Sequence, residues 1–293
     1  NAYLKTYYPE EYYTALLNTD KSKINIFVQD MMKNDFSIAN PDINKSKIDF
    51  SPNGRKSIIF GLAGLKDVTA ESVKAIINAR EEKGEFTSFF DFFKKVDRGS
   101  LSEKVVQRLI QAGAFDSIDD RRDVLIANIG NGLKYAGKLA REKKEKGYIL
   151  HELFGARGIH KDAKKLIVNS NDAIVEPELV IPEDKDRWTE IKAIEEEKEA
   201  IGLCLSKNMF SIYQKKLGGL EAATSLGDVN SKQHYQTFLF AGIVTKKDAL
   251  ITKKDKKPIA FITLDDGFFS QKIVMFDSVY KAVSYTHLTL PTI

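Results

Sequence analysis

The sequence predicts a mainly α-helical fold that is followed by a small all-β module. Over roughly the first two hundred residues, apolar side chains recur at the i, i+3, i+4, i+7 spacing of an amphipathic helix. Helix start and stop signals, with Ser, Thr or Pro before an apolar stripe and Gly after it, bracket these segments. From Thr237 the pattern changes to short β-branched and aromatic runs separated by Lys, Asp and Gly turns. Only three or four strands are present, so we expect the β module to be truncated.

Composition and charge are those of a soluble globular protein. The 293-residue chain is 43% apolar and 29% charged, and its formal net charge of +4 does not by itself require a nucleic-acid partner. The single cysteine, Cys204, excludes an internal disulfide framework and suits a reducing compartment, so we expect a cytoplasmic protein. The histidines offer no tetrahedral zinc spacing: His151, His160, His234 and His287. No apolar run approaches the roughly 18 residues of a spanning helix and no signal peptide is present, so no membrane partner is expected.

Residues 1–55 are predicted to hold two helices and then an irregular segment. Pro9 suits the first position of a helix, and the two acidic residues after it favour the positive end of the helix dipole. A second helix, over about residues 23–33, has one apolar face. The segment 40–54 is rich in Pro, Asn and Gly, which predicts a boundary near residue 50. Because the chain does not begin with Met, we expect its N-terminus to be a cut.

Residues 56–120 are predicted to form two hairpin-like pairs of helices. In the first, "GLAGLKDVTAESVKAII" has a short turn followed by a helix with an apolar stripe. In the second, Ser102 is placed to cap a helix that Gly113 stops. Between them, "GEFTSFFDFFKK" carries five phenylalanines. At roughly 1.5–3 kcal/mol for each buried ring, we expect this connector to form the core that joins the hairpins.

Residues 121–225 are predicted to form a helical and irregular connector, and residues 226–282 the β module. A strongly basic helix covers 121–147, whereas 155–187 has no regular pattern. The next helix follows Trp188 and closes near Gly202.

The last eleven residues, 283–293, continue neither pattern. Their sequence, "VSYTHLTLPTI", resembles the translation of a transposon-end and adapter sequence used in short-read DNA library preparation. We therefore expect this tail to be read-through at the end of a sequenced fragment. The coding nucleotides decide the matter, because any other encoding of "SYTHLTLPT" would exclude an adapter.

Several stretches, taken in order, resemble the bacterial replicative DNA polymerase III alpha subunit. "YLKTYYPEEYYTALL" and "PDINKSKIDF" resemble the end of its fingers region. "IFGLAGLKDVTAESVKAIINAREEKGEFTSFFDFFKKVD" with "LIQAGAFDSI" resembles its tandem helix-hairpin-helix segment. "ELFGARG" and "EEEKEAIGLCLS" resemble the connector that follows, and "FAGIVTKKDALITKKDKKPIAFITLDD" the first strands of its OB domain. The collinear order of these stretches, which covers residues 2–282, is more specific than any single motif.

The resemblance implies a mainly α fold, made of the end of the helical fingers and the tandem hairpins, followed by a truncated OB-like module. It implies a parent enzyme that synthesises DNA with Mg²⁺ held by palm carboxylates upstream of this chain. We expect no catalytic residue and no cofactor in this segment, since the one obvious carboxylate pair, Asp265–Asp266, is a turn signature. The implied partners are primer-template duplex, template single strand, the sliding clamp and other replicase subunits.

The turn of the first hairpin departs from the family pattern. Such a hairpin holds DNA by aiming backbone N–H groups at the start of its second helix toward a phosphate, and glycines let the backbone approach. Asp67 and Thr69 stand at the two usual glycine positions, and a non-glycine residue in the left-handed region costs roughly 1–2 kcal/mol. Thr69 can instead cap the helix, with Lys66 and Lys74 in reach of phosphate. The alternative is a hairpin retained for packing, with Val68 buried.

Two further groups are DNA-binding candidates. Ser102 and Lys104 begin the second helix of the second hairpin, where the alternative is an ordinary cap and a solvated lysine. The stretch "TKKDALITKKDKK" is predicted to be a basic β-turn of an OB-like sheet, where a basic groove with stacking aromatics tracks single strands. A solubilising hairpin is the alternative there. Its candidate lysines are Lys246, Lys247, Lys253, Lys254, Lys256 and Lys257, and the aromatics near them are Phe238, Phe240 and Phe261.

The stretch "YILHELFG" offers a protein-partner site. It resembles the family's short clamp-binding peptide, in which a polar residue precedes a Leu-Phe pair that inserts into a surface pocket. The candidate residues are Leu150, Glu152, Leu153 and Phe154. Leu150 stands where the family peptide usually has Gln, so the polar side chain of that position is missing here. The alternative is a hydrophobic patch that closes the basic helix onto the hairpins.

The leading hypothesis is the DNA- and clamp-engaging part of a bacterial replicative polymerase. A free-standing helix-hairpin-helix/OB accessory protein that binds nucleic acid is the alternative, and palm motifs in the same reading frame upstream would distinguish the two. A purely helical interaction scaffold is a third hypothesis, and it predicts no salt-dependent affinity for primer-template DNA.

Overall fold

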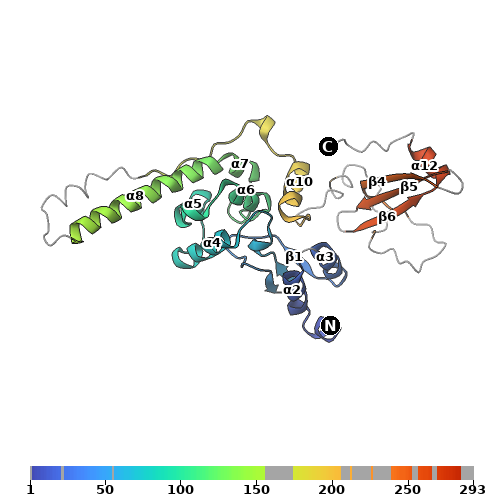
Figure 1. Ribbon diagram of the computed structural model, residues 1–293, viewed down its shortest axis with the longest axis horizontal. Helices are drawn as coiled ribbons and strands as arrows, with labels where there is room; N and C mark the ends of the chain where they lie inside the picture. The colour runs from blue at the N-terminus through green and yellow to red at the C-terminus, as the bar shows by residue number, and fades with distance from the viewer. Residues whose placement is uncertain are drawn as a thin grey trace. The chain divides into compact units, whose positions relative to one another are not determined.

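The computed structural model of the chain describes residues 2–20, 23–54, 56–155, 174–205, 212, 226, 239–252, 257–265 and 269–284, of which 25, 145–155 and 281–284 are described by their backbone alone. The chain divides into two compact units, residues 1–205 and residues 206–293 (Figure 1). In the first unit one hydrophobic core continues from Tyr13 to Ile201. The helices predicted near the N-terminus, the hairpins and part of the connector therefore pack as one body.

The first unit begins with three helices: α1 (Ala2–Tyr7), α2 (Pro9–Thr19) and α3 (Ile24–Lys33). As the sequence predicts, Pro9 lies in the first turn of α2. Tyr13 of α2 and Met31 of α3 are buried in the core between them. The ammonium group of Lys5 lies 2.7 Å from the carboxylate of Asp30, which ties α1 to α3.

A small sheet follows, where the sequence shows only a break in regular structure. Its strands are β1 (Ser37–Ala39), β2 (Ser51–Gly54) and β3 (Ser57–Ile59), in the order β1-β3-β2. β1 runs parallel to β3 and β2 runs antiparallel to it. Strands of three or four residues are too short for an alternating pattern to show in the sequence. Asn18 of α2 holds the backbone N–H and carbonyl of Phe50 at 2.9 and 3.0 Å, so the sheet is fixed to the helices.

Two consecutive helix pairs make up the centre of the first unit. They comprise a 3-10 turn (Leu62–Gly64), α4 (Ala70–Lys83), α5 (Phe89–Lys95), a second 3-10 turn (Arg98–Ser100) and α6 (Glu103–Gln111). Thr69, Ser88 and Ser102 cap α4, α5 and α6, each accepting the N–H of the residue three positions on. Gly113, which follows α6, has a φ of +79°, so the predicted cap and stop of the second hairpin are both confirmed.

The phenylalanine-rich connector is core, as predicted, and its centre is the helix α5. All five rings, from Phe86 to Phe93, are at most 3% exposed. Phe92 of α5 stacks edge-on against Phe86 and against Phe115 beyond α6, with ring centroids 5.2 and 5.1 Å apart. The rings thus join the first helix pair to the second.

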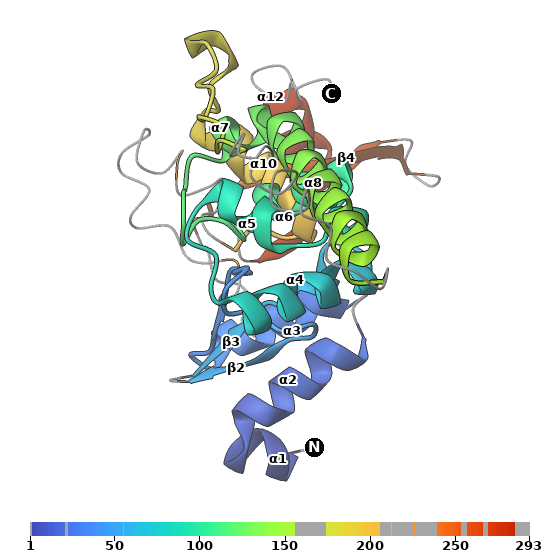
Figure 2. The same cartoon turned by 90° about the vertical axis from the view of Figure 1, so that its left-hand side faces the viewer.

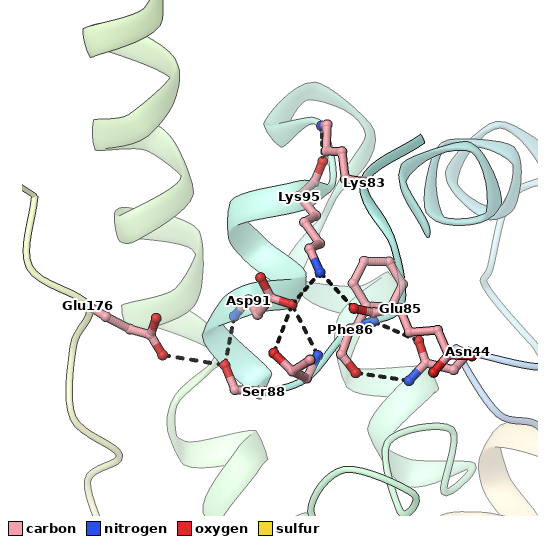
Figure 3. A network of polar contacts seen from close by, with 9 residues as sticks. Asn44, Lys83, Glu85, Phe86, Ser88, Asp91, Lys95 and Glu176 are labelled. Carbon is pink, nitrogen blue, oxygen red and sulfur yellow. Dashed lines mark hydrogen bonds and ion pairs between the residues drawn. The ribbon is translucent and has the colours of Figure 1, made fainter. Parts of the chain in front are cut away.

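Polar contacts hold the connector from outside (Figure 3). Asn44 bonds the N–H and the carbonyl of Phe86, both at 2.9 Å. Asp91 of α5 accepts the N–H of Thr87 at 3.0 Å and pairs with Lys95 at 2.7 Å. Segments far apart in the sequence therefore fix the start of α5.

The rest of the first unit is α7 (Arg122–Ala127), the long α8 (Ile129–Gly155), a 3-10 turn (Asp184–Asp186) and α10 (Glu190–Ile201). α8 packs along α5 and extends beyond it (Figure 2). A Cβ atom at Gly132 would lie 2.2 Å from the ring of Phe93, so the close approach of the two helices requires glycine there. α10 ends, as predicted, at Gly202, whose φ is +95°.

The second unit contains an antiparallel sheet of β4 (Ile243–Ile251), β5 (Pro258–Asp265) and β6 (Ser270–Met275) in that order, followed by α12 (Asp277–Ser284). A mainly α fold followed by a short β module is thus confirmed. The basic stretch differs from its prediction, because Lys246 and Lys247 lie within β4, opposite Thr263 and Ile262 of β5, and not in a turn. Pairing with the apolar β5 strand outweighs the low intrinsic strand preference of Lys and Asp.

Candidate nucleic-acid interface

The turn of the first hairpin adopts the conformation that normally favours glycine. Asp67 has a φ of +61°. Val68 packs against the core but is only half-buried, whereas the packing alternative expects it to be buried. An aspartate therefore holds the left-handed conformation of this turn, whereas Thr69, at the other usual glycine position, is extended.

The start of α4 presents groups that can bind an anion. Thr69 accepts the N–H of Ser72 at 3.2 Å, as its predicted role as a cap requires. Within the described part of the chain, the exposed N–H groups of Ala70 and Glu71 have no acceptor. Lys66 and Lys74 are also exposed, so two predicted cations flank a helix N-terminus with free donors.

The second hairpin repeats this arrangement at α6. Ser102 accepts the N–H of Val105 at 3.2 Å, and the N–H groups of Glu103 and Lys104 have no acceptor among the described residues. The hydroxyl of Ser72 donates to the carbonyl oxygen of Ser100 at 2.7 Å. This partly buried bond fixes the start of α4 against the turn of the second hairpin.

Asp67 neutralises part of the positive charge of the second hairpin. Its carboxylate lies 3.1 Å from Nζ of Lys104 and 3.2 Å from Nε of Arg108. The hydrogen bond from Lys104, supported by Arg108, lowers the pKa of Asp67. Lys104, a predicted phosphate ligand, is thus engaged by an internal carboxylate. Sequence reasoning missed Arg108, whose place on the polar side of α6 gave no separate signal.

The C-terminal end of α10 covers the other side of the first hairpin. The backbone N–H of Lys66 donates to the carbonyl oxygen of Ala200 at 3.0 Å, and Glu199 pairs with Arg108 at 2.8 Å. Deeper inside, the guanidinium of Arg122 lies 2.6 Å from Asp116 and 3.1 Å from the fully buried Glu197. Burial alone would lower the pKa of Arg122, but its bonds to these two carboxylates outweigh burial and raise it.

The predicted lysines of the second unit are only partly described. Lys246 pairs with Asp248 at 3.0 Å, and the ammonium group of Lys247 lies 5.4 Å from the ring centre of Tyr280. Lys257 is exposed, and its backbone bonds Thr252 across the connection between β4 and β5. Lys253, Lys254 and Lys256 lie outside the described residues, as do Phe238 and Asp266.

One cation of this sheet was missed from the sequence. Lys272 of β6 lies 4.4 Å from the ring centre of Phe261 on β5. Phe261 itself is half-buried, and so is Phe240.

The predicted clamp-binding stretch forms the last turn of α8. The backbone of Leu150, Glu152, Leu153 and Phe154 is helical, and their side chains lie outside the described part of the structure. Among the described residues no helix is long and apolar enough to cross a bilayer. The same residues contain no group of three or more His, Cys, Asp or Glu that could hold a metal ion.

Paired helices joined by tight turns define a class of protein, and residues 35–125 match the family model described as the helix-hairpin-helix motif. The chain is 28% identical over 278 residues to the DNA polymerase III subunit alpha of Pasteurella multocida (strain Pm70), covering 94% of this chain and 22% of that protein. It is 30% identical over 270 residues to the same subunit of Neisseria meningitidis serogroup A, covering 90% of this chain and 21% of that protein. The Escherichia coli (strain K12) subunit is 26% identical over 277 residues, covering 94% and 22%.

The chain is therefore related to bacterial DNA polymerase III alpha subunits over nearly all of its length. The resemblance stated from the sequence is confirmed. The chain spans about a fifth of the length of these curated relatives.

Proposed function

We propose that this chain is a DNA-binding part of a bacterial replicative polymerase and that its two hairpins hold the phosphates of primer-template duplex. The observation that carries the proposal is the pair of capped and exposed helix N-termini at Thr69 and Ser102. Each presents two backbone N–H groups that have no acceptor among the residues the structure describes, which is the geometry that binds phosphate. The relation to DNA polymerase III alpha subunits supports the same assignment.

Replacing the caps by aspartate tests the proposal. Thr69→Asp and Ser102→Asp keep a good cap but put a negative charge where phosphate would bind. We expect each variant to lower the affinity for duplex DNA about tenfold and to reduce the slope of log K against log salt by about 0.9. Thr189→Asp, at the exposed cap of α10, is the matched control. Fluorescence anisotropy with labelled primer-template DNA measures all three, and equal affinities would refute the hairpin assignment.

We propose that the parent polymerase uses Mg²⁺ for deoxynucleotidyl transfer at carboxylates outside this segment, in the cytoplasm and together with other replicase subunits. The chain's own part is to hold duplex close to that chemistry. A free-standing hairpin and OB accessory protein remains the alternative, and it predicts the same DNA affinity without palm motifs in the same reading frame. A helical scaffold predicts no salt-dependent affinity at all.

The clamp and single-strand contacts complete the proposal. Leu153 and Phe154 would anchor the sliding clamp, and a Leu153→Ala/Phe154→Ala variant should then lose retention on a clamp-coated surface while its DNA affinity stays unchanged.

The lysines near the connection between β4 and β5, with Lys272 over Phe261, would bind template single strand on an OB-like sheet. Lys257→Gln/Lys272→Gln should then weaken binding of an oligothymidine strand, with a salt slope reduced by up to about 1.4.

A further inference from the structure

A pocket with a volume of about 260 Å³ lies between the end of α5, the turn of the second hairpin and α8. Its lining includes apolar residues, among them Val96 and Leu139. Of the described residues that line it, six are cationic and one, Asp97, is acidic; the cationic residues are Lys83, Lys94, Lys95, Arg98, Lys143 and Lys144. So many like charges around one cavity repel one another unless an anion lies among them.

The position of Lys143 on α8 is unusual for a residue that only faces solvent. The side of α8 that packs on α5 carries Gly132, Ala136 and Leu139, at helical spacing. Lys143 is the next residue of that stripe, where packing alone would favour an apolar side chain. Lys94 belongs to the last turn of α5 and lines the same pocket, so each of the two helices contributes a lysine to it.

Half of the cations in the pocket already have internal partners. Lys95 pairs with Asp91 at 2.7 Å, Lys83 donates to the carbonyl oxygen of Lys95, and Arg98 donates to that of Leu101 at 2.7 Å. Asp97 accepts the N–H of Gly99 at 2.9 Å. These bonds hold this part of the pocket wall together within the protein.

The other three cations are available to a ligand. In the described portion of the chain, Lys94, Lys143 and Lys144 have no acidic partner. They come from two helices and converge on one cavity, and they are exposed to a ligand that enters from solvent.

We propose that this pocket binds phosphate, as a backbone phosphodiester of the DNA that the hairpins hold. The inference rests on the proposed DNA-binding function. The cations suit the phosphate and the apolar lining residues suit the face of a deoxyribose. Asp97 and Arg98 belong to the turn of the second hairpin, directly before α6, and they line the pocket together with residues of α8. The DNA-binding surface would therefore extend from the start of α6 across the pocket to α8. A free polyphosphate has the same chemistry and is the second source to be distinguished.

The test uses the whole 293-residue chain with two double variants of equal charge change. Lys94→Gln/Lys143→Gln alters the pocket, and Lys134→Gln/Lys138→Gln alters exposed residues of α8 that do not line it. Anisotropy with labelled duplex at several salt concentrations gives affinity and slope. In parallel, mass spectrometry measures acetylation of Lys94, Lys143 and Lys144 by an acylating reagent, with duplex DNA or with inorganic pyrophosphate. Circular dichroism confirms that both variants fold.

We expect the pocket variant to bind duplex about tenfold more weakly, with a slope reduced by about 1 to 2, and the control to change less than about twofold. DNA should protect the three lysines from acetylation. Equal behaviour of the two double variants, with normal binding by the parent chain, would overturn the pocket and leave the hairpin function intact. Pyrophosphate protection without DNA binding would refute the proposed function but retain the pocket as a free polyphosphate site. Protection by neither ligand would overturn the pocket, whereas a parent chain that binds no duplex would refute the proposed function.

Discussion

The carboxylate of Asp67 lies 3.1 Å from the ammonium group of Lys104, so the turn of the first hairpin is ion-paired to the helix of the second. Asp67 holds a left-handed backbone conformation, with a φ of +61°, while it makes this contact. The residue that replaces the expected glycine thus links the two hairpins. It also engages the charge of Lys104 in an internal ion pair, so a phosphate would have to compete for that charge.

Asp67→Gly is expected to be more stable than Asp67→Ala. Both variants lose the same ion pairs, but only glycine adopts a φ of +61° without strain. The difference should be about 1 kcal/mol in the free energy of unfolding, measured by urea denaturation. Two equally stable variants would show that the turn relaxes to another conformation.

Asp67→Asn is expected to raise the affinity for duplex DNA by about three- to tenfold at low salt. The amide tolerates the left-handed turn, while Lys104 and Arg108 lose the negative charge that engages them. Asp184→Asn, an equal charge change at an exposed 3-10 turn, is the control in the same anisotropy assay. An unchanged affinity for Asp67→Asn would mean that this pair does not compete with phosphate.

Glu197→Ala is expected to lower the free energy of unfolding by about 3–5 kcal/mol. The change leaves buried Arg122 with one carboxylate instead of two and removes the acceptor of the Leu205 N–H. Glu195→Ala, at an exposed position of the same helix, should cost less than about 0.5 kcal/mol. Chemical denaturation followed by circular dichroism compares them, and similar losses would contradict a buried ionic contact.

Asp91→Asn is expected to lose stability at neutral pH but not in acid. Burial opposes ionisation of Asp91, yet the bonds from Lys95 and from the Thr87 N–H outweigh it and lower its pKa below the usual 3.8. A carboxyl whose pKa is lower in the folded state stabilises the fold above its unfolded pKa, and this contribution is lost as the pH falls through the folded value. The gap between parent and variant should be about 1 kcal/mol at pH 7 and should close below about pH 4. A gap that is constant across thermal melts from pH 7 to pH 3 would contradict this.

Local signals in the sequence predicted much of the fold. Helix caps and stops depend on residues within one helical turn, so the local sequence is enough to predict them. Those at Thr69, Ser102 and Gly113 are examples. The phenylalanine-rich core followed from apolar area alone. The strands β1 to β3 were missed because each is too short to show a period.

The electrostatics of the candidate site could not be predicted in the same way. The pairing of Asp67 with Lys104 depends on how two helix pairs pack, and that packing is set by residues distant in the chain. Lys246 and Lys247 were expected in a turn because neither favours strands, but backbone pairing to β5 decides their conformation. Charge in the sequence therefore indicated which residues face solvent, and tertiary structure decided which of them are still available to DNA.

The contacts between α10 and the hairpins have a consequence for how the chain acquires its structure on the ribosome. The hairpins emerge first, but the acceptor of the Lys66 N–H and the second carboxylate of Arg122 belong to residues 197–200, which are made much later. Until Glu197 is made, the buried positive charge of Arg122 can pair only with the carboxylate of Asp116. Completion of the hairpin unit must therefore wait for contacts of high sequence separation, which makes it a late and comparatively slow step of folding.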